Sequence, residues 1–160
     1  MALQATVHAS AVLVGARAVL IRGPSGAGKS RLALELIEAA RGGNVLSFAR
    51  LVADDRAHLE SAGGRLLVRP AETLAGLLEV RGVGLLRLPH EPRAVVGLVV
   101  DLDAADAERL PEPARQRTEI AGVVLPRLAV AAGAAALPAV LALLTSSWSD
   151  RAGLARDIGP

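Results

Sequence analysis

The sequence predicts a single α/β domain in which a glycine-rich loop joins a buried strand to an amphipathic helix. Residues 18–21 form a short apolar run that is typical of a buried strand. The loop GPSGAGKS follows at residues 23–30, and apolar residues then recur at helical spacing over residues 32–40. With 160 residues, of which 52% are hydrophobic, the chain is long enough for one core. We therefore expect one domain over residues 1–145 and a C-terminal tail over residues 146–160.

Further strands are predicted from apolar runs that end at glycine, proline or charged residues. They lie at residues 11–15, 51–53, 57–61, 65–69, 94–102 and 120–131. Short helices are predicted at residues 71–77 and 137–144. Between residues 78 and 88, Gly82 and Gly84 indicate a close approach of two backbone segments. Strands interspersed with helices in this order predict the α/β class.

The composition excludes several classes of protein. A formal charge of +2 and only 1% aromatic residues argue against a nucleic-acid partner. The chain has no cysteine, so disulfides and thiolate metal sites are excluded. Residues 128–144 are apolar enough for a membrane span to be considered, but Gly133 and Pro138 interrupt them, which favours a core strand followed by a buried helix. We expect a cytoplasmic protein that binds neither membrane nor nucleic acid.

The loop at residues 23–30 carries the first chemical signal, because it fits the phosphate-binding pattern G-x-x-x-x-G-K-[ST]. Lys29 within it is the only lysine of the chain. An ammonium on a flexible stem can reach between β- and γ-phosphates, whereas guanidinium is a broad planar fork. The predicted nucleotide-binding residues are Gly23, Pro24, Ser25, Gly26, Ala27, Gly28, Lys29 and Ser30. The hydroxyl of Ser30 is the expected ligand of Mg²⁺.

Carboxylates elsewhere could complete such a site, although each has a structural alternative. Asp54 and Asp55 follow an apolar strand and could supply a base, or they could be a solvated pair at a turn. Glu79 and Arg81 would share one face of an extended segment, as a metal ligand with a phosphate clamp or simply as an ion pair. Asp101 ends an apolar strand, as does the metal-binding aspartate of ordinary P-loop kinases, but any strand end could look the same.

Taken together, these motifs resemble one family. The sequence contains HASAVLVGARAVLIRGPSGAGKSRLALELI, then LVADDR, then LEVRGVGLL. This combination is similar to the catalytic, C-terminal domain of bacterial HPr kinase/phosphorylase, in a truncated form that lacks the N-terminal domain. The resemblance implies a fold like that of phosphoenolpyruvate carboxykinase, with a mixed sheet, flanking helices and a P-loop. It also implies a homo-oligomer, typically a hexamer.

The resemblance further implies an ATP- and Mg²⁺-dependent protein-serine kinase that phosphorylates an HPr-type phosphocarrier protein of a phosphotransferase system. Asp55 would be the base, Lys29 would hold the phosphates, and Ser30 with Glu79 would hold the metal. His8 and Arg109 match further active-site positions of the family, while Asp54 and Arg81 would support the site.

One departure from the family concerns its basic loop that is linked to dephosphorylation. Residues 131–136 read AAGAAA here and offer no cation for inorganic phosphate, which argues against phosphorolytic reversal. Two other functions stay open. One is a small-molecule kinase that uses Asp101 at the metal, and the other is a catalytically silent module that senses ATP.

Overall fold

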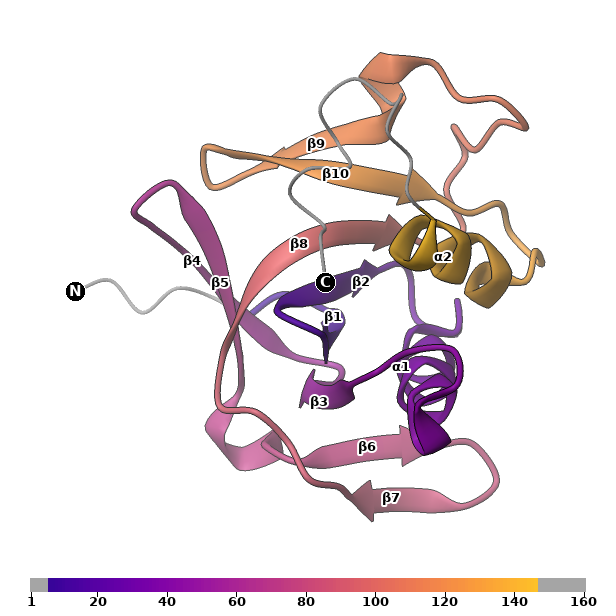
Figure 1. The fold of residues 1–160 in the computed structure, drawn as a ribbon. Helices are drawn as coiled ribbons and strands as arrows, with labels where there is room; N and C mark the ends of the chain where they lie inside the picture. Colours follow the sequence, from indigo (N-terminus) through magenta and orange to yellow (C-terminus); the bar gives the residue numbers. More distant parts are fainter. Residues whose placement is uncertain (1–5, 147–160) are drawn as a thin grey trace.

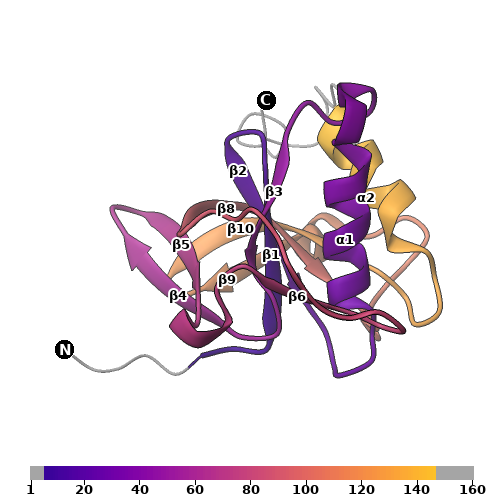
Figure 2. The same ribbon diagram turned by 90° about the horizontal axis from the view of Figure 1, so that it is seen from below.

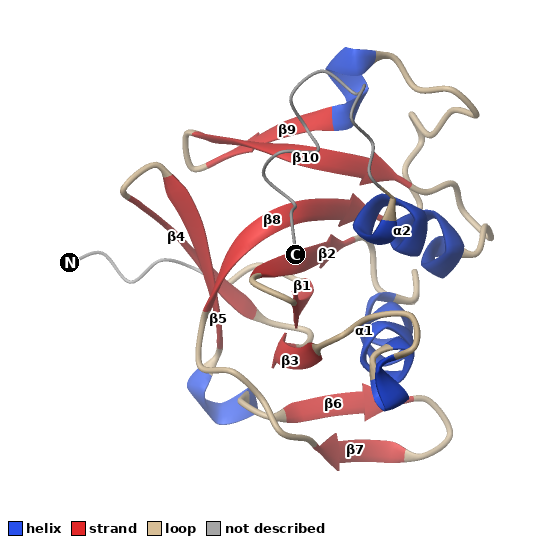
Figure 3. Ribbon diagram, in the orientation of Figure 1, coloured by secondary structure: helices blue, strands red, loops and turns tan. Residues whose placement is uncertain are grey.

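The computed structural model describes residues 6–146. Within this range the main sheet has the central strand order β3-β1-β2-β8-β10-β9, and the hairpin β4–β5 joins it through β8 (Figure 1). Its strands are β1 (Ala9–Val14), β2 (Arg17–Arg22), β3 (Ala49–Ala53), β4 (Ala57–Ala62), β5 (Arg65–Pro70), β8 (Ala94–Asp101), β9 (Arg117–Ile120) and β10 (Val123–Ala129). A second small sheet pairs β6 (Leu77–Val80) with β7 (Gly84–Arg87). The helices α1 (Lys29–Ala39) and α2 (Ala136–Thr145) complete the predicted α/β class (Figure 3).

The directions of the strands bring several chain segments to one edge of the sheet. Strands β2, β8 and β10 run parallel to one another, while β1 is antiparallel to both β2 and β3. Strand β3 therefore runs in the same direction as β2. The carboxyl ends of β2, β3, β8 and β10 all meet at this edge, and the start of β1 lies there too. Ligands of α/β proteins collect at such an edge, because the loops that follow parallel strands converge there.

The two faces of the sheet are covered differently. Helices α1 and α2 lie side by side on one face, and the hairpin β4–β5 lies on the other side (Figure 2). Strand β2 shows the alternation that this requires, since Val19 and Ile21 belong to the core under the helices whereas Ala18 and Leu20 belong to the second core. Burial of these aliphatic side chains on both faces explains why β2 is a continuous apolar run.

Three local predictions were wrong in detail. Residues 71–77 form only a 3₁₀ turn (Glu72–Leu74) followed by β6. The helix cannot continue, because Gly76 has a φ of 77° and the ring of His90 occupies the space of a side chain there, 2.6 Å from where a Cβ would lie. The expected strand 120–131 is present but shorter, as β10 (Val123–Ala129), because Ile120 ends β9 and a turn at Ala121 and Gly122, with φ values of 51° and 79°, joins the two strands.

The predicted role of Gly82 and Gly84 in a close backbone approach was also wrong. They lie in and just after the turn between β6 and β7, with φ values of 85° and 109°, and a Cβ added at either would meet nothing within 4 Å. Their role is a left-handed turn conformation and not a close backbone approach.

The apolar stretch 128–144 divides between the end of β10 and the helix α2. Across residues 6–146, none of the helices combines the length and the apolar character that crossing a membrane requires. The predicted C-terminal tail lies outside the described residues from position 147 onward.

Candidate active site

A cleft of about 750 Å³ opens at the sheet edge where the parallel strands end. Its walls are the loop and first turns of α1, the turn between β6 and β7, and residues 130–136 before α2. His8, Asp55 and Glu79 also line it. The cleft therefore collects most of the residues that the sequence analysis selected, from segments that are far apart in the chain.

The glycine-rich loop forms one wall and leads directly into α1. Gly26 and Gly28 have φ values of 82° and 101°, a conformation that most residues avoid, and a Cβ at either would point into open space. The first turn of α1 contains no acidic residue, and its backbone N–H groups have no helical acceptors. A helix start of this kind attracts anions through these N–H groups and the helix dipole. The geometry therefore fits a phosphate group.

Lys29 is largely buried, with 8% of its surface exposed. Its Nζ donates hydrogen bonds to the carbonyl oxygens of Gly23 and Pro24, at 2.8 and 3.1 Å. The ammonium is thus held by the loop that surrounds it, without a carboxylate partner among the described residues. A carboxylate there would compete with phosphate for the charge, so this arrangement leaves Lys29 available to an anionic ligand.

Asp54 is buried, with 5% of its surface exposed, and its carboxylate joins three elements. Oδ1 accepts hydrogen bonds from the hydroxyls of Ser10 and Ser30, each at 2.7 Å, and Oδ2 accepts one from the backbone N–H of Glu79 at 3.1 Å. The carboxylate thus connects β1, α1 and β6. Ser10 was not predicted, and its only signal in the sequence is a hydroxyl within an apolar strand.

Asp55 lies at the rim of the cleft in an unusual backbone conformation. Its φ is 68°, and the N–H of Arg56 donates to the carbonyl of Asp54 across it at 2.8 Å, which closes a tight three-residue turn. Its side chain is 59% exposed, and Oδ1 lies 3.6 Å from Nδ1 of His8. Strained positions of this kind cluster at functional sites, because the strain directs one side chain toward a ligand.

Glu79 and Arg81 both line the cleft, as predicted, but not by simple alternation along one strand. Strand β6 ends at Val80, so Arg81 already belongs to the turn. Among the described residues neither Glu79 nor Arg81 forms an ion pair, so they do not pair with each other. The carboxylate and the guanidinium are both free to meet a ligand.

Two further candidates lie elsewhere. Arg109 is exposed in the loop between β8 and β9 and is not among the described residues that line the cleft. Asp101 is also absent from that lining, and its carboxylate accepts a bidentate pair of hydrogen bonds from Arg22 at 2.7 and 2.8 Å and another from Arg127 at 2.5 Å. Two arginines already neutralise Asp101, which leaves it unsuited to bind a metal.

The network around Asp101 continues to Asp106, whose carboxylate accepts hydrogen bonds from both terminal nitrogens of Arg127, at 2.8 and 2.9 Å. Burial raises the pKa of Asp101, but the hydrogen bonds and charges of Arg22 and Arg127 outweigh it and hold that pKa below its usual value. The hydrogen bond from Arg127 lowers the pKa of Asp106 as well. These residues therefore tie β2, β8 and β10 together as a structural clamp.

The residues present suit a magnesium ion that arrives with a nucleotide. Within residues 6–146 no three carboxylates or histidines cluster closely enough to hold a metal by themselves. Magnesium usually binds through one or two protein ligands, water and substrate phosphates, so such a cluster is not required. Ser30 and Glu79, which both line the cleft, could serve as its ligands. The proton of the Ser30 hydroxyl is directed to Asp54, so the lone pairs of the hydroxyl oxygen are free.

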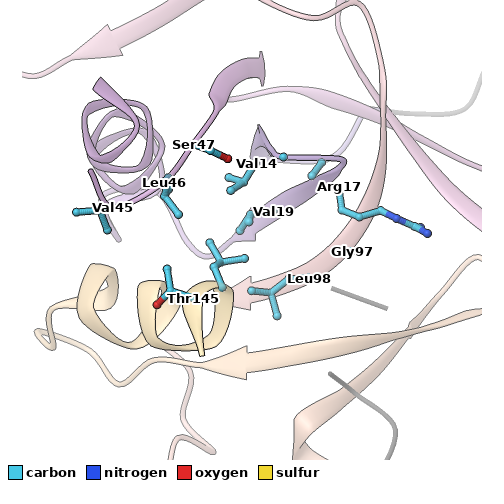
Figure 4. Close-up of a pocket in the computed structure, with 12 residues that line it drawn as sticks. Val14, Arg17, Val19, Val45, Leu46, Ser47, Gly97, Leu98 and Thr145 are labelled. Atoms are coloured by element: carbon cyan, nitrogen blue, oxygen red, sulfur yellow. The ribbon is translucent and has the colours of Figure 1, made fainter. Parts of the chain in front are cut away.

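A second, smaller cavity of about 130 Å³ lies at the opposite edge of the sheet, near the end of α2 (Figure 4). Its lining is mainly aliphatic, including Val14, Val19 and Leu98, and the Arg17 side chain extends away from these residues. Among the residues that the structure describes, no carboxylate or histidine lines it. Its lining provides no group for acid–base or metal chemistry, so we place the chemistry of the protein in the larger cleft.

Known proteins resemble this chain in sequence and in structure. The sequence model of the family described as "HPr Serine kinase C-terminal domain" matches residues 1–141. HPr kinase/phosphorylase from Geobacillus thermodenitrificans is 33% identical over 138 residues, which are 78% of this chain and 41% of that protein. The enzyme of the same name from Streptococcus thermophilus is 42% identical over 87 residues, or 54% of this chain and 26% of that protein.

The chain therefore spans less than half of the length of these two relatives. A solved structure, titled "Structure of the Hpr(Ser) kinase/phosphatase from Coxiella burnetii", superposes with a TM-score of 0.68 at 24% identity. The superposition covers 86% of this chain and 91% of that one. At this identity the likeness shows the fold, which agrees with the α/β arrangement of sheet and helices described above.

Proposed function

Because the chain belongs to the family of HPr serine kinase C-terminal domains, we propose that it transfers the γ-phosphoryl group of ATP to a serine hydroxyl of an HPr-type phosphocarrier protein. The observation that carries the proposal is the position of Asp55, which lies in a strained turn and lines the same cleft as the phosphate-binding loop. Phosphoryl transfer needs a phosphate cradle, a metal site and a group that receives the proton of the acceptor hydroxyl. The cleft offers a candidate for each.

The loop of residues 23–30 would bind the nucleotide phosphates through backbone N–H groups at the start of α1. Lys29 would exchange its two carbonyl acceptors, Gly23 and Pro24, for oxygens of the β- and γ-phosphates. The burial of Lys29 would strengthen the attraction between its ammonium and the phosphates, since the charge acts across a medium less polar than water. Phosphate binding would therefore use the same ammonium that holds the free loop together.

Ser30 and Glu79 would hold Mg²⁺ together with phosphate oxygens. When bound, the ion neutralises negative charge that develops on the transferred phosphoryl group. Ser30 contributes the lone pairs of its hydroxyl oxygen, and Glu79 contributes a carboxylate that has no other ion pair among the described residues. Arg81, in the turn after β6, also lines the cleft and would bind the anionic phosphates from there.

Asp55 would accept the proton of the carrier's serine as the serine oxygen bonds to the γ-phosphorus and the bond to ADP breaks. Its exposure at the rim suits a base that must meet a protein substrate. Nδ1 of His8, 3.6 Å from the carboxylate, would orient it. Arg109 stays a prediction of the family resemblance, since it lies outside the cleft lining.

The proposal favours transfer to the carrier over phosphorolytic reversal. Reversal requires a site for inorganic phosphate, and the segment 131–136, most of which lines the cleft, contains no cation. Among the described residues, the lysine and arginines of the cleft lining are Lys29, Arg31 and Arg81. Lys29 and Arg81 would bind the nucleotide phosphates, and Arg31 pairs with Glu35 at 3.2 Å. The relatives named HPr kinase/phosphorylase carry both activities in their names. Direct measurement of the reverse reaction decides whether the protein catalyses transfer alone or both transfer and phosphorolysis.

Several finer properties belong to the same proposal. ATP and a phosphotransferase-system carrier would place the reaction in the cytoplasm. A hexameric assembly is expected from the family resemblance, and the mass of the assembly in solution tests it. The alternative of a small-molecule kinase that uses Asp101 is not favoured, because that carboxylate is already paired with Arg22 and Arg127.

The test is incubation of the protein with Mg-ATP and a purified HPr-type carrier, followed by mass spectrometry of the carrier. We expect one added phosphoryl group on a serine. A carrier in which that serine is replaced by alanine is the control. Absence of transfer with retained ATP binding would favour the ATP-sensing module. For reversal, the phosphorylated carrier is mixed with inorganic phosphate and the release of pyrophosphate is measured.

A further inference from the structure

We propose that Ser10 is a positioning residue for the divalent metal, acting through the buried carboxylate of Asp54. The proposal rests on the proposed function, because it concerns the metal that Ser30 and Glu79 would hold there. Ser10 is not among the described residues that line the cleft, so it would contact neither a nucleotide nor a metal bound there. Its effect must pass through the residue that it touches.

The placement of Ser10 in the core requires an explanation. It is fully buried on β1, within the sequence Ala9-Ser10-Ala11-Val12. Strand alternation puts Ser10 on the same face as Val12, which packs in the core under the helices. A hydroxyl in such a position is unfavourable unless it is hydrogen-bonded. Ser10 meets this condition through one strong hydrogen bond to Oδ1 of Asp54, at 2.7 Å.

This hydrogen bond completes the set of partners around Asp54. Oδ1 has two lone-pair directions, and the hydroxyls of Ser10 and Ser30 occupy both. Oδ2 receives the backbone N–H of Glu79. Three donors from three elements therefore fix the rotation of the carboxylate, in a site that solvent reaches poorly, since Asp54 is only 5% exposed.

The fixed carboxylate of Asp54 in turn holds both proposed metal ligands, Ser30 and Glu79, in position. Ser30 has a single hydroxyl proton, and its donation to Asp54 leaves the lone pairs of the oxygen for a metal. Glu79 is held by its backbone, which places its side chain at the cleft wall. Removal of the Ser10 hydroxyl would leave one lone pair of Oδ1 unfilled and the carboxylate held by two donors in place of three. Partners of this kind outside the ligand set commonly change metal affinity by about 10–100-fold.

The experiment separates positioning from a merely structural role. Three variants are compared with the parent: Ser10→Ala, Ser10→Thr and Val12→Ala. Ser10→Ala removes the donor, and Ser10→Thr keeps it with a side chain suited to a strand. Val12→Ala is the matched control, because Val12 is equally buried on β1 and packs in the same core, but has no hydrogen bond to Asp54.

The readout is binding of Mn²⁺, measured as loss of the free-ion electron paramagnetic resonance signal, in the presence of a non-hydrolysable ATP analogue. Binding of the analogue in EDTA is measured in parallel. We expect Ser10→Ala to weaken Mn²⁺ binding by about tenfold, while binding of the analogue in EDTA stays at the parent value. Ser10→Thr should restore Mn²⁺ binding. Val12→Ala should lower the melting temperature without changing Mn²⁺ affinity.

Parent-like Mn²⁺ affinity in Ser10→Ala would overturn the proposal, as would an equal loss in Val12→Ala. If Ser10→Ala does not fold, Ser10→Cys replaces it, since a thiol fills the place of the hydroxyl with a slightly larger atom but donates only weakly. The result is independent of the kinase assay, because the Mn²⁺ measurement involves no carrier. A parent that binds Mn²⁺ in a Ser10-dependent way but does not phosphorylate the carrier would refute the proposed function and leave this inference standing.

Discussion

Nδ1 of His8 lies 3.6 Å from Oδ1 of Asp55, at the point where the start of β1 meets the end of β3. Both side chains are largely exposed, at 62% and 59%, so the pair is worth little to stability. We therefore expect its value to lie in orienting the carboxylate of Asp55. His8→Ala should slow phosphoryl transfer to the carrier by about tenfold, with ATP affinity and melting temperature unchanged.

His58→Gln is the control for this prediction, because His58 lies on β4 and is not among the described residues of the cleft lining. It should leave the transfer rate near the parent value. Transfer by His8→Ala at the parental rate would show that Asp55 is oriented by its turn alone.

Glu79 is predicted to determine how much Mg²⁺ the transfer reaction needs. Glu79→Gln keeps the size of the side chain and removes its charge, so the Mg²⁺ concentration that gives half of the maximal rate should rise by about tenfold or more. Binding of ATP in EDTA should stay the same, since the phosphate-binding loop is intact. Glu35→Gln is the matched control, because Glu35 also lines the cleft but pairs with Arg31 at 3.2 Å. An unchanged Mg²⁺ requirement in Glu79→Gln would remove Glu79 from the metal site.

The clamp around Asp101 makes a prediction about stability and pH. The carboxylate is 15% exposed and bonded to Arg22 and Arg127, so Asp101→Asn should lower the free energy of unfolding by about 1–3 kcal/mol near neutral pH. The folded state lowers the pKa of Asp101, so this stabilisation is complete above the unfolded-state pKa of about 3.9 and is lost as the pH falls through the lower folded-state value.

Urea unfolding of the parent and of Asp101→Asn, from about pH 6 down to about pH 3, measures this effect. The difference between the two proteins should shrink toward the acid end. The pKa of Asp106 is also lowered, so its titration destabilises both proteins at the acid end and does not by itself change the difference. Metal affinity should not change in Asp101→Asn. A large loss of metal binding would instead support the small-molecule kinase alternative.

Gly97 in β8 is predicted to tolerate no side chain. A Cβ at this position would lie 2.7 Å from Cβ of Arg17 on the neighbouring strand β2, where the register shifts between Ala18 and Val19. Because both atoms are attached to backbone, neither can move away easily, and Gly97→Ala should destabilise the fold by about 1–3 kcal/mol. Gly63→Asn, in an exposed turn with a φ of 59°, should change stability little. Equal stability of the parent and Gly97→Ala in urea would contradict the predicted clash with Arg17.

The parts of the site that the sequence predicted are those whose signal is local. The phosphate-binding loop is one unbroken motif, and its strand and helix follow from apolar spacing on either side. The strand before Asp54 and Asp55 is similarly visible in the sequence. Strands β3 and β2 run in the same direction. This alone is enough to bring the two acids to the edge of the sheet where β2 ends.

The contacts of Asp54 could not be predicted in the same way, because its partners Ser10, Ser30 and Glu79 are 44, 24 and 25 residues away. Nothing in a local pattern says which hydroxyls a buried carboxylate will meet. The predicted helix at residues 71–77 failed for a related reason. Its residues favour a helix locally, but the packing of His90 on Gly76 and the pairing of β6 with β7 decide the structure.

Transfer of phosphate to the carrier by Asp55→Asn tests the central claim most directly. Asparagine keeps the size of the side chain and tolerates the φ of 68°, so the fold and ATP binding should be preserved. Asp103→Asn provides the comparison, because Asp103 lines the same cleft and also has a left-handed backbone, with a φ of 51°. We expect Asp55→Asn to slow formation of phosphoserine about 10²–10⁴-fold, and Asp103→Asn to slow it far less. Phosphoserine formed by Asp55→Asn at the parental rate would contradict the account.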